Sequence, residues 1–297
     1  MGKRILVKSL KWIYLGRNCN YNCLHCRYRK NAELIRKTDD ILAEIRDAKG
    51  EGQGVFINGG DIFEHPGWKE ILKELSKHDN TTMIYTNASH AVFEDKARAL
   101  AESVDYIVAY VPAHFSYAQT IITGVQGSYL AEEAGLINIR NADAKVVIKT
   151  PITRFVADEP HNYINWAGET LGDAAIGAWV EFPELNNQRL NKLKNGPGMS
   201  TRIFETYNVR LVNGELFANL LLQEFGKQVA VAENIPPCII RDIDAVEFLW
   251  TGSEYVKEPI CGLCKLRTVC KGILKSYKER VKHSRELHPI LVDVPVR

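Results

Sequence analysis

The chain has 297 residues, of which 45% are hydrophobic and 25% charged, an ordinary composition for a globular protein with a full core. No uninterrupted apolar run reaches the roughly 18 residues that a membrane-spanning helix needs, and the basic N-terminal stretch lacks the apolar centre of a secretory signal. We therefore expect a cytoplasmic protein without a membrane segment.

Charge is distributed unevenly along the chain, although the net charge is only +2. Residues 1–37 carry a net charge of +9 and residues 257–297 one of +6, so the residues between them carry −13. Basic segments occur at binding sites for phosphates or nucleic acid, but solvated helix faces carry similar charges. The pattern leaves both an anionic substrate and an ordinary charged surface open.

Apolar segments of strand length alternate with helical patterns through the first part of the chain. The helical patterns cover about residues 38–48, 66–75 and 90–103, with further candidates between the later strands. Six strands are predicted, at residues 11–15, 55–58, 82–87, 105–111, 145–150 and 178–182. The alternation predicts an α/β fold with a parallel sheet. Because a closed barrel needs eight strands, we expect a partial (βα)6 barrel over residues 1–186.

The pattern changes beyond this barrel. Residues 186–198 are polar and rich in turn formers, which is typical of a linker. The alternation around Asn213 and Gly214 predicts a β-hairpin, and a basic helix is expected at about residues 271–286. We therefore predict a second domain over residues 187–297, a small cysteine-rich α+β unit.

The loop after the first predicted strand carries Cys19, Cys23 and Cys26. Thiolates are soft ligands that suit iron–sulfur clusters, and a cubane held by three cysteines keeps one iron open. An open iron can bind a small molecule and deliver an electron to it. A structural zinc site fits less well, because it needs four protein ligands and only His25 is available nearby as a fourth.

The run CNYNCLHC resembles the cysteine loop of radical S-adenosylmethionine enzymes, and the resemblance extends over about residues 8–185. It implies a partial barrel with a 4Fe–4S cluster and S-adenosylmethionine as cofactors. In that family the cluster cleaves S-adenosylmethionine, and the resulting 5′-deoxyadenosyl radical removes a hydrogen atom from the substrate. The resemblance also implies an electron donor such as flavodoxin or ferredoxin, and it places His25 near the adenine.

A second match lies at Gly59, Gly60 and Asp61, which follow the second predicted strand. The family has a similar motif that receives the amino group of the cofactor's methionine part. Glycines permit a close backbone approach, and a carboxylate accepts hydrogen bonds from an ammonium group. The ends of the fourth and fifth strands offer further polar candidates, from which we select Lys149; the others are His114, Ser116 and Thr150.

Four more cysteines near the end of the sequence allow either a four-thiolate zinc site or a second iron–sulfur cluster. They are Cys238, Cys261, Cys264 and Cys270. The run from Cys261 to Cys270 resembles the auxiliary-cluster domains called SPASM and twitch, which implies an auxiliary 4Fe–4S cluster. The SPASM pattern has a further cysteine where this chain has Leu274, so the resemblance is to a reduced version with one cluster.

The two cysteine groups together predict a radical S-adenosylmethionine enzyme with an auxiliary cluster. All seven cysteines are assigned to the clusters, so none is left to quench a substrate radical, and we expect an oxidation or a rearrangement or isomerisation. The basic segments favour an anionic substrate, either a phosphorylated small molecule, a nucleotide or a modified base in nucleic acid. The alternatives are a peptide-modifying enzyme and a zinc-containing nucleic-acid-binding protein without radical activity.

Overall fold

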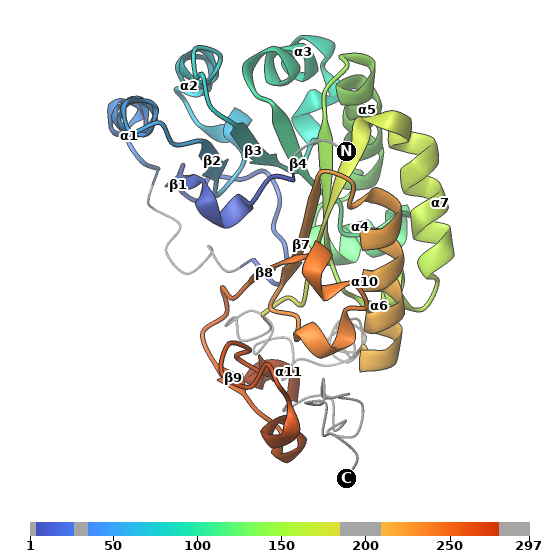
Figure 1. Cartoon of the computed structure of the whole chain (residues 1–297). Coiled ribbons are helices and arrows are strands. Elements are labelled where there is room, and N and C mark those ends of the chain that lie inside the picture. The colour runs from blue at the N-terminus through green and yellow to red at the C-terminus, as the bar shows by residue number, and fades with distance from the viewer. Residues whose placement is uncertain (1–3, 27–34, 185–208, 279–297) are drawn as a thin grey trace.

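The centre of the molecule is a parallel sheet that curls into a half-barrel (Figure 1). The computed structural model describes residues 4–26, 35–184 and 209–278. Each strand pairs with the next one in the sequence, so all the crossovers run in one direction around the sheet. The strands are β1 (Lys11–Tyr14), β2 (Val55–Asn58), β3 (Thr82–Thr86), β4 (Tyr106–Tyr110), β5 (Val146–Pro151), β6 (Ala175–Glu181), β7 (Val229–Glu233) and β8 (Glu247–Leu249).

The predicted partial barrel is confirmed, but within the described residues its sheet has eight strands where six were predicted. β7 pairs with β6 and β8 pairs with β7, so the sheet continues beyond residue 186. Both strands are short, and β8 has only three residues, too few to show a periodic pattern in the sequence. The division into two domains at residue 186 stays a prediction, and the predicted linker at 186–198 lies outside the described residues.

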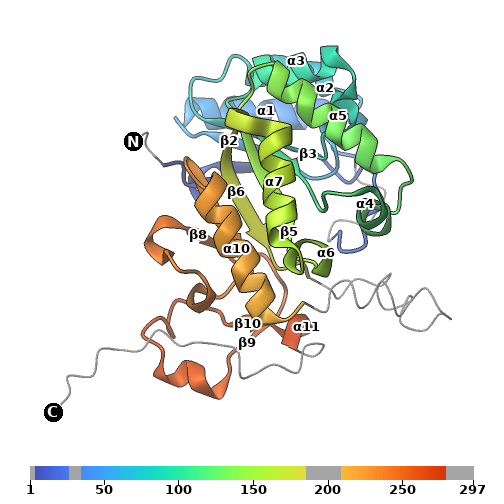
Figure 2. The same cartoon turned by 90° about the vertical axis from the view of Figure 1, so that its right-hand side faces the viewer.

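Helices cover the outer face of the sheet, as the two perpendicular views show (Figure 1, Figure 2). In α2, for example, Ile71, Leu72 and Leu75 recur at helical spacing and are buried. The third predicted helix begins at Glu94 instead of residue 90, because a 3-10 turn occupies Ser89–Val92. The helices are α1 (Thr38–Gly50), α2 (Trp68–Leu75), α3 (Glu94–Ser103), α4 (Ser116–Thr123), α5 (Ser128–Asn141), α6 (Arg154–Ala157), α7 (Pro160–Leu171) and α10 (Leu211–Phe225).

The hairpin predicted at Asn213 and Gly214 is wrong, because this segment belongs to the helix α10. An Asn–Gly pair favours a tight turn, but the apolar residues after it recur at helical spacing. Gly214 lies where an added Cβ would be 3.1 Å from the ring of Phe182, so the glycine allows α10 to approach the sheet closely. The tertiary packing of α10 outweighs the local turn preference. Its buried apolar residues are Phe217, Ala218, Leu221, Leu222 and Phe225.

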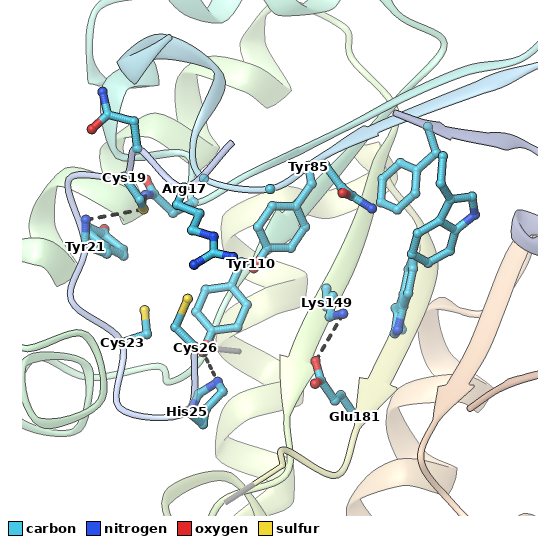
Figure 3. Close-up of a pocket in the computed structure, with 18 residues that line it drawn as sticks. Arg17, Cys19, Tyr21, Cys23, His25, Cys26, Tyr85, Tyr110, Lys149 and Glu181 are labelled. Carbon is cyan, nitrogen blue, oxygen red and sulfur yellow. Dashed lines mark hydrogen bonds and ion pairs between the residues drawn. The ribbon is translucent and has the colours of Figure 1, made fainter. Parts of the chain in front are cut away.

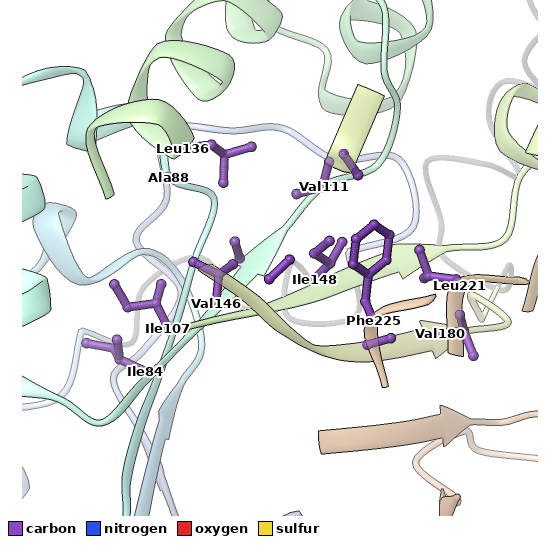
Figure 4. Close-up of a cluster of buried hydrophobic side chains, with 14 of the residues drawn as sticks. Ile84, Ala88, Ile107, Val111, Leu136, Val146, Ile148, Val180, Leu221 and Phe225 are labelled. Carbon is purple, nitrogen blue, oxygen red and sulfur yellow. The ribbon is translucent and has the colours of Figure 1, made fainter. Parts of the chain in front are cut away.

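The strands bury side chains on both faces, which gives the sheet two separate apolar clusters. The outer cluster lies between the strands and the helices (Figure 4) and includes Ile84, Ile107, Leu136, Val146, Ile148, Val180, Leu221 and Phe225. The inner cluster lines the hollow side of the half-barrel and includes Phe56, Met83, Val108, Val147, Trp179 and Val231, with Trp12 packed against it. The inner cluster is rich in aromatic rings, and these rings shape the cavity described below.

Beyond β8 the chain forms a small unit with an antiparallel pair of strands, β9 (Tyr255–Val256) and β10 (Ile273–Leu274). The helix α11 (Lys275–Lys278) follows, so the predicted basic helix starts later than residue 271, and its continuation lies outside the described residues. In the described part of the chain, no helix combines the length and apolar character needed to cross a bilayer.

Candidate functional site

A cavity of about 290 Å³ opens at the carboxyl ends of the strands, the edge at which parallel α/β sheets bind their ligands. Cys19, Cys23 and Cys26 line one end of this cavity (Figure 3). Lys149 and Glu181 line it farther along the sheet. The three cysteines that were grouped by their spacing therefore share one cavity with residues from distant strands.

Residues that lie between the cysteines in the sequence form hydrogen bonds that hold the loop against the neighbouring helices. The backbone N–H groups of Asn22 and Leu24 donate to two carbonyls in the last turn of α4, at 2.7 and 2.9 Å. The hydroxyl of Tyr21 donates to the carbonyl of Ser128, at 3.2 Å. These contacts anchor the loop backbone, so the thiols are held at the cavity.

The thiol of Cys19 is partly buried and lies beside groups that raise or lower its pKa. Burial, followed by the charge of Asp61, raises the pKa of the Cys19 thiol to about 12. The N–H of Tyr21 and the side-chain amide of Asn87 both point at its sulfur, at 3.4 and 3.6 Å. A thiol with such a pKa stays protonated near neutral pH unless positive charge is placed beside it. Three thiols at one end of one cavity are the donor set that holds a cubane with one open iron.

Gly59 and Gly60 lie at the cavity and are required by the geometry of the chain. Their φ angles are +86° and +59°, in the left-handed region that favours glycine. A Cβ on Gly60 would lie 2.2 Å from the carbonyl oxygen of Asn18, and the next N–H, that of Asp61, donates to this oxygen at 2.8 Å. The glycine turn thus packs directly on the start of the cysteine loop, which links the two motifs found in the sequence.

Asp61 does not line the cavity, in contrast to the predicted contact with an ammonium group. Its carboxylate is 1% exposed and accepts hydrogen bonds from the N–H of Phe63 at 3.1 Å, the hydroxyl of Thr86 at 2.7 Å and the N–H of Asn87 at 3.0 Å. The carboxylate therefore connects the glycine turn to the end of β3. This places Asn87, and not Asp61, at the cavity.

Two polar side chains lie near the thiols, and the sequence predicted only one of them. His25 was predicted to lie at the site, and its Nε2 is 2.7 Å from the hydroxyl of Tyr110 at the end of β4. Arg17 was not predicted, but it lines the cavity beside the cysteine loop (Figure 3). Nε and Nη1 of Arg17 are buried and have no hydrogen-bond partner within the described part of the chain. A buried cation of this kind favours an anionic ligand.

Lys149 lies at the end of β5, and carboxylates compensate its charge on two sides. Its ammonium nitrogen is 3.0 Å from an oxygen of Glu181 and 2.5 Å from an oxygen of Glu233. The same oxygen of Glu233 accepts the indole N–H of Trp179, at 2.8 Å. Two acidic side chains therefore already contact this one cation. This arrangement argues against the predicted role of Lys149 as a contact for an anionic part of a cofactor.

The remaining polar candidates from the strand ends do not line the cavity. The hydroxyl of Thr150 is 2.5 Å from that of Tyr163, and both are buried. The ring of His114 packs edge-to-face against Phe115 and Tyr163, and burial lowers the pKa of its imidazole. Ser116 is the first residue of α4.

Several cavity residues were missed by the sequence reasoning: Trp12, Arg17, Tyr85, Asn87, Tyr110, Trp179 and Glu181. Most of them come from the strands or directly follow them, and they are polar or aromatic residues in otherwise apolar segments. A signal was therefore present. A polar or aromatic residue near the carboxyl end of a buried parallel strand indicates the functional edge of the sheet.

The four later cysteines also come together in space. Cys238, Cys261, Cys264 and Cys270 line one small pocket in the C-terminal unit. Burial, followed by the charge of Cys270, raises the pKa of the Cys238 thiol to about 12. Within residues 4–26, 35–184 and 209–278, no group of three or more His, Cys, Asp or Glu side chains is arranged to hold a single metal ion. The choice between zinc and a cluster stays open on this geometry.

Comparison with known proteins identifies a family for the first part of the chain. Residues 13–118 match the family model of the radical SAM superfamily. A tRNA-2-methylthio-N(6)-dimethylallyladenosine synthase from Carboxydothermus hydrogenoformans is 32% identical over 89 residues, which are 27% of this chain and 20% of that protein. The protein of the same name from Streptomyces avermitilis is 26% identical over 155 residues, which are 48% of this chain and 30% of that protein.

Solved structures share the fold at low sequence identity. Streptococcus suis SuiB bound to S-adenosylmethionine has a TM-score of 0.56 at 16% identity, covering 82% of this chain and 51% of SuiB. The structure of anSMEcpe with bound AdoMet has a TM-score of 0.53 at 14% identity, covering 72% of this chain and 59% of the other. The chain spans about half the length of SuiB and at most 30% of the curated relatives.

Proposed function

This chain belongs to the radical SAM superfamily, and on that premise we propose that it cleaves S-adenosylmethionine reductively and removes a hydrogen atom from a substrate in the cavity. Cys19, Cys23 and Cys26 would hold a 4Fe–4S cluster through three of its irons. When bound, the cluster and S-adenosylmethionine supply the electron and the 5′-deoxyadenosyl radical. The residues of the chain hold these groups and orient the substrate.

The polar groups around the thiols support a place for the amino acid part of S-adenosylmethionine. The backbone of Gly59 and Gly60 lines the cavity, where its carbonyl groups can accept hydrogen bonds from an ammonium group. The buried guanidinium of Arg17 can donate to a carboxylate. His25, held by Tyr110, would lie against the adenine. In this proposal Asp61 supports the glycine turn from behind, and Lys149 faces the substrate instead of the cofactor.

The net reaction follows from what the chain can return to a substrate radical. Its seven cysteines divide into the two groups described, so we propose no thiol as a hydrogen donor. An oxidation or a rearrangement of the substrate then remains as the outcome. An external electron donor such as flavodoxin or ferredoxin would reduce the enzyme.

The relatives suggest two kinds of macromolecular substrate. The curated relatives are named for the modification of an adenosine in tRNA, and SuiB was solved with its precursor peptide SuiA. We favour a nucleotide or a base in nucleic acid, because residues 1–37 and 257–297 carry the net positive charge that attracts phosphates. A peptide substrate is the alternative.

The observation that carries the proposal is the meeting of three thiols, two glycines and a buried guanidinium in one cavity. Its test is the formation of 5′-deoxyadenosine by the anaerobically reconstituted full chain with S-adenosylmethionine and dithionite. The C19S variant should form none, whereas the C270S variant should retain the reaction. Equal product from C19S and the unchanged protein would contradict the proposal.

We propose further that Cys238, Cys261, Cys264 and Cys270 hold an auxiliary 4Fe–4S cluster, because all four line one pocket. Iron, sulfide and zinc analysis of the reconstituted chain tests this assignment. Two cubanes give about eight irons per chain, and the C270S variant should lose about half of them. About four irons with one zinc would instead identify the second site as a zinc site.

A further inference from the structure

The part of the cavity away from the cysteines has a wall of aromatic rings, which we call the inner subsite. It consists of Trp12, Phe56, Tyr85, Lys149, Trp179 and Glu181. The ring centroid of Phe56 lies 5.0 Å from that of Trp12 and 5.7 Å from that of Trp179. Aromatic walls of this kind bind flat apolar surfaces by stacking and edge contacts.

Trp12 and Tyr85 are half-buried and present ring surface to a ligand, whereas Phe56 and Trp179 are each 1% exposed and pack against Trp12. Nε1 of Trp12 donates to the carbonyl of Val7 at 3.1 Å, and Nε1 of Trp179 donates to Glu233 at 2.8 Å. Stacking on Trp12, and not hydrogen bonding to indole, is therefore what this wall offers a ligand.

The charges of the inner subsite exclude two other kinds of ligand. The Lys149 ammonium is already flanked by the carboxyl groups of Glu181 and Glu233 in a buried place, so a phosphate or carboxylate there would lie beside two acidic groups. An amine would meet the ammonium of Lys149, which lies 4.3 Å from the ring centroid of Trp179 and already occupies the position in which an aromatic ring attracts a cation. An uncharged flat ligand meets neither obstacle.

The polar end of the subsite places a donor beside an acceptor. The Lys149 ammonium and the Glu181 carboxylate are 3.0 Å apart, and both line the cavity. A heterocycle with neighbouring N–H and C=O groups on one edge matches this pair, because its carbonyl accepts from the ammonium and its N–H donates to the carboxylate. Carboxylate oxygens accept several hydrogen bonds at once, so Glu181 can serve Lys149 and a ligand together.

We propose that the inner subsite binds an uncharged, flat nitrogen heterocycle with adjacent N–H and C=O groups, such as a uracil-like or guanine-like base. The inference rests on the proposed function, because it names the part of the substrate that this cavity takes. Phosphate groups of such a substrate would lie outside the inner subsite, which limits the expected anionic recognition to the mouth of the cavity.

Calorimetric titration of the reconstituted full chain, saturated with S-adenosylmethionine and without a reductant, tests the proposal. The probes are uridine, 3-methyluridine, ribose 5-phosphate and butylamine. Uridine should bind, and 3-methyluridine, which lacks the edge N–H, should bind about tenfold more weakly or worse. Ribose 5-phosphate or butylamine binding as tightly as uridine would overturn the proposal, as would the failure of uridine to bind.

Variants connect this binding to the named residues. W12L and E181Q should each weaken uridine binding about tenfold while S-adenosylmethionine still binds, which also shows that the variant is folded. The matched control is W68L, because Trp68 lies on α2 outside the cavity lining. Unchanged uridine affinity in W12L would refute the stacking role. Uridine binding does not require the cleavage of S-adenosylmethionine. A protein that binds uridine but forms no 5′-deoxyadenosine would therefore support the inner subsite and contradict only the proposed function.

Discussion

Nε2 of His25 lies 2.7 Å from the hydroxyl oxygen of Tyr110, and this contact joins the cysteine loop to the carboxyl end of β4. Both side chains are buried and line the cavity. A loop without regular secondary structure would otherwise sample many conformations, and ordering it before a cofactor binds lowers the cost of binding. The contact therefore contributes to the site without touching the reacting atoms.

Removing the Tyr110 hydroxyl should loosen the loop. We expect the free energy of unfolding of Y110F to be about 1 kcal/mol lower and its binding of S-adenosylmethionine to be several-fold weaker, because the hydrogen bond to His25 is lost while the ring volume is kept. Chemical denaturation and titration measure the two effects. Y106F is the control, because the Tyr106 hydroxyl bonds Gln228 at the opposite end of the same strand. Equal S-adenosylmethionine affinities for the two variants would contradict the account.

Arg17 is predicted to bind the carboxylate of S-adenosylmethionine. The R17Q variant should bind S-adenosylmethionine about tenfold or more weakly, since a charge-assisted hydrogen bond contributes about 1.5–3 kcal/mol. The loss should be much smaller for S-adenosyl compounds that lack the carboxylate. The control is R36Q, because Arg36 pairs with Glu44 and does not line the cavity. An R17Q protein with unchanged affinity would show that the guanidinium has another ligand.

Asp61 should prove a structural residue. In D61N one of three hydrogen-bond donors, on Phe63, Thr86 and Asn87, loses its acceptor, so the free energy of unfolding should fall by about 1–3 kcal/mol. The folded fraction should keep its affinity for S-adenosylmethionine. If the affinity falls instead while the stability holds, the carboxylate contacts the cofactor as the family resemblance implied.

The buried group of Lys149, Glu181 and Glu233 should respond asymmetrically to substitution. K149M leaves two buried carboxylates without their cation, and we expect a loss of about 3–5 kcal/mol in the free energy of unfolding. Adding E181Q and E233Q to K149M removes the repulsion and should recover part of this loss. Denaturation of the single and triple variants measures both changes, and a triple variant less stable than K149M would contradict the electrostatic explanation.

Glu132 should make the stability of the protein depend on pH. Its carboxyl group is 1% exposed, and burial raises its pKa well above the usual range, although it accepts a hydrogen bond from Gln119 at 2.5 Å. The folded chain therefore keeps a proton that the unfolded chain releases above about pH 4.3. It follows that this stabilising contribution is complete below that pH and is lost as the pH rises toward the folded-state value.

The E132Q variant isolates this effect. The free energy of unfolding of the unchanged protein, relative to that of E132Q, should fall by at most about 1.4 kcal/mol per pH unit as the pH rises above the unfolded-state pKa of about 4.3. The exposed Glu51 at the end of α1 provides the control variant, E51Q, which should follow the unchanged protein. Parallel curves for the unchanged protein and E132Q would rule out the predicted proton.

The sequence by itself determined the features that depend on neighbouring residues. The spacing of Cys19, Cys23 and Cys26 defines a loop motif, and the strands up to residue 182 are visible as apolar segments between helical patterns. Local spacing and periodicity are properties of a short segment, so one sequence is enough to predict them.

Only the tertiary structure decided the features that depend on residues far apart in the chain. Asn213 and Gly214 form a helix because α10 packs on β6, and the strands β7 and β8 became recognisable through pairing with the sheet. Lys149 and Glu233 are 84 residues apart, yet they meet at the ends of strands flanking β6. The physical reason is that the charge and the hydrogen-bond partners of a buried side chain are set by whatever the fold places beside it. No local pattern contains that information.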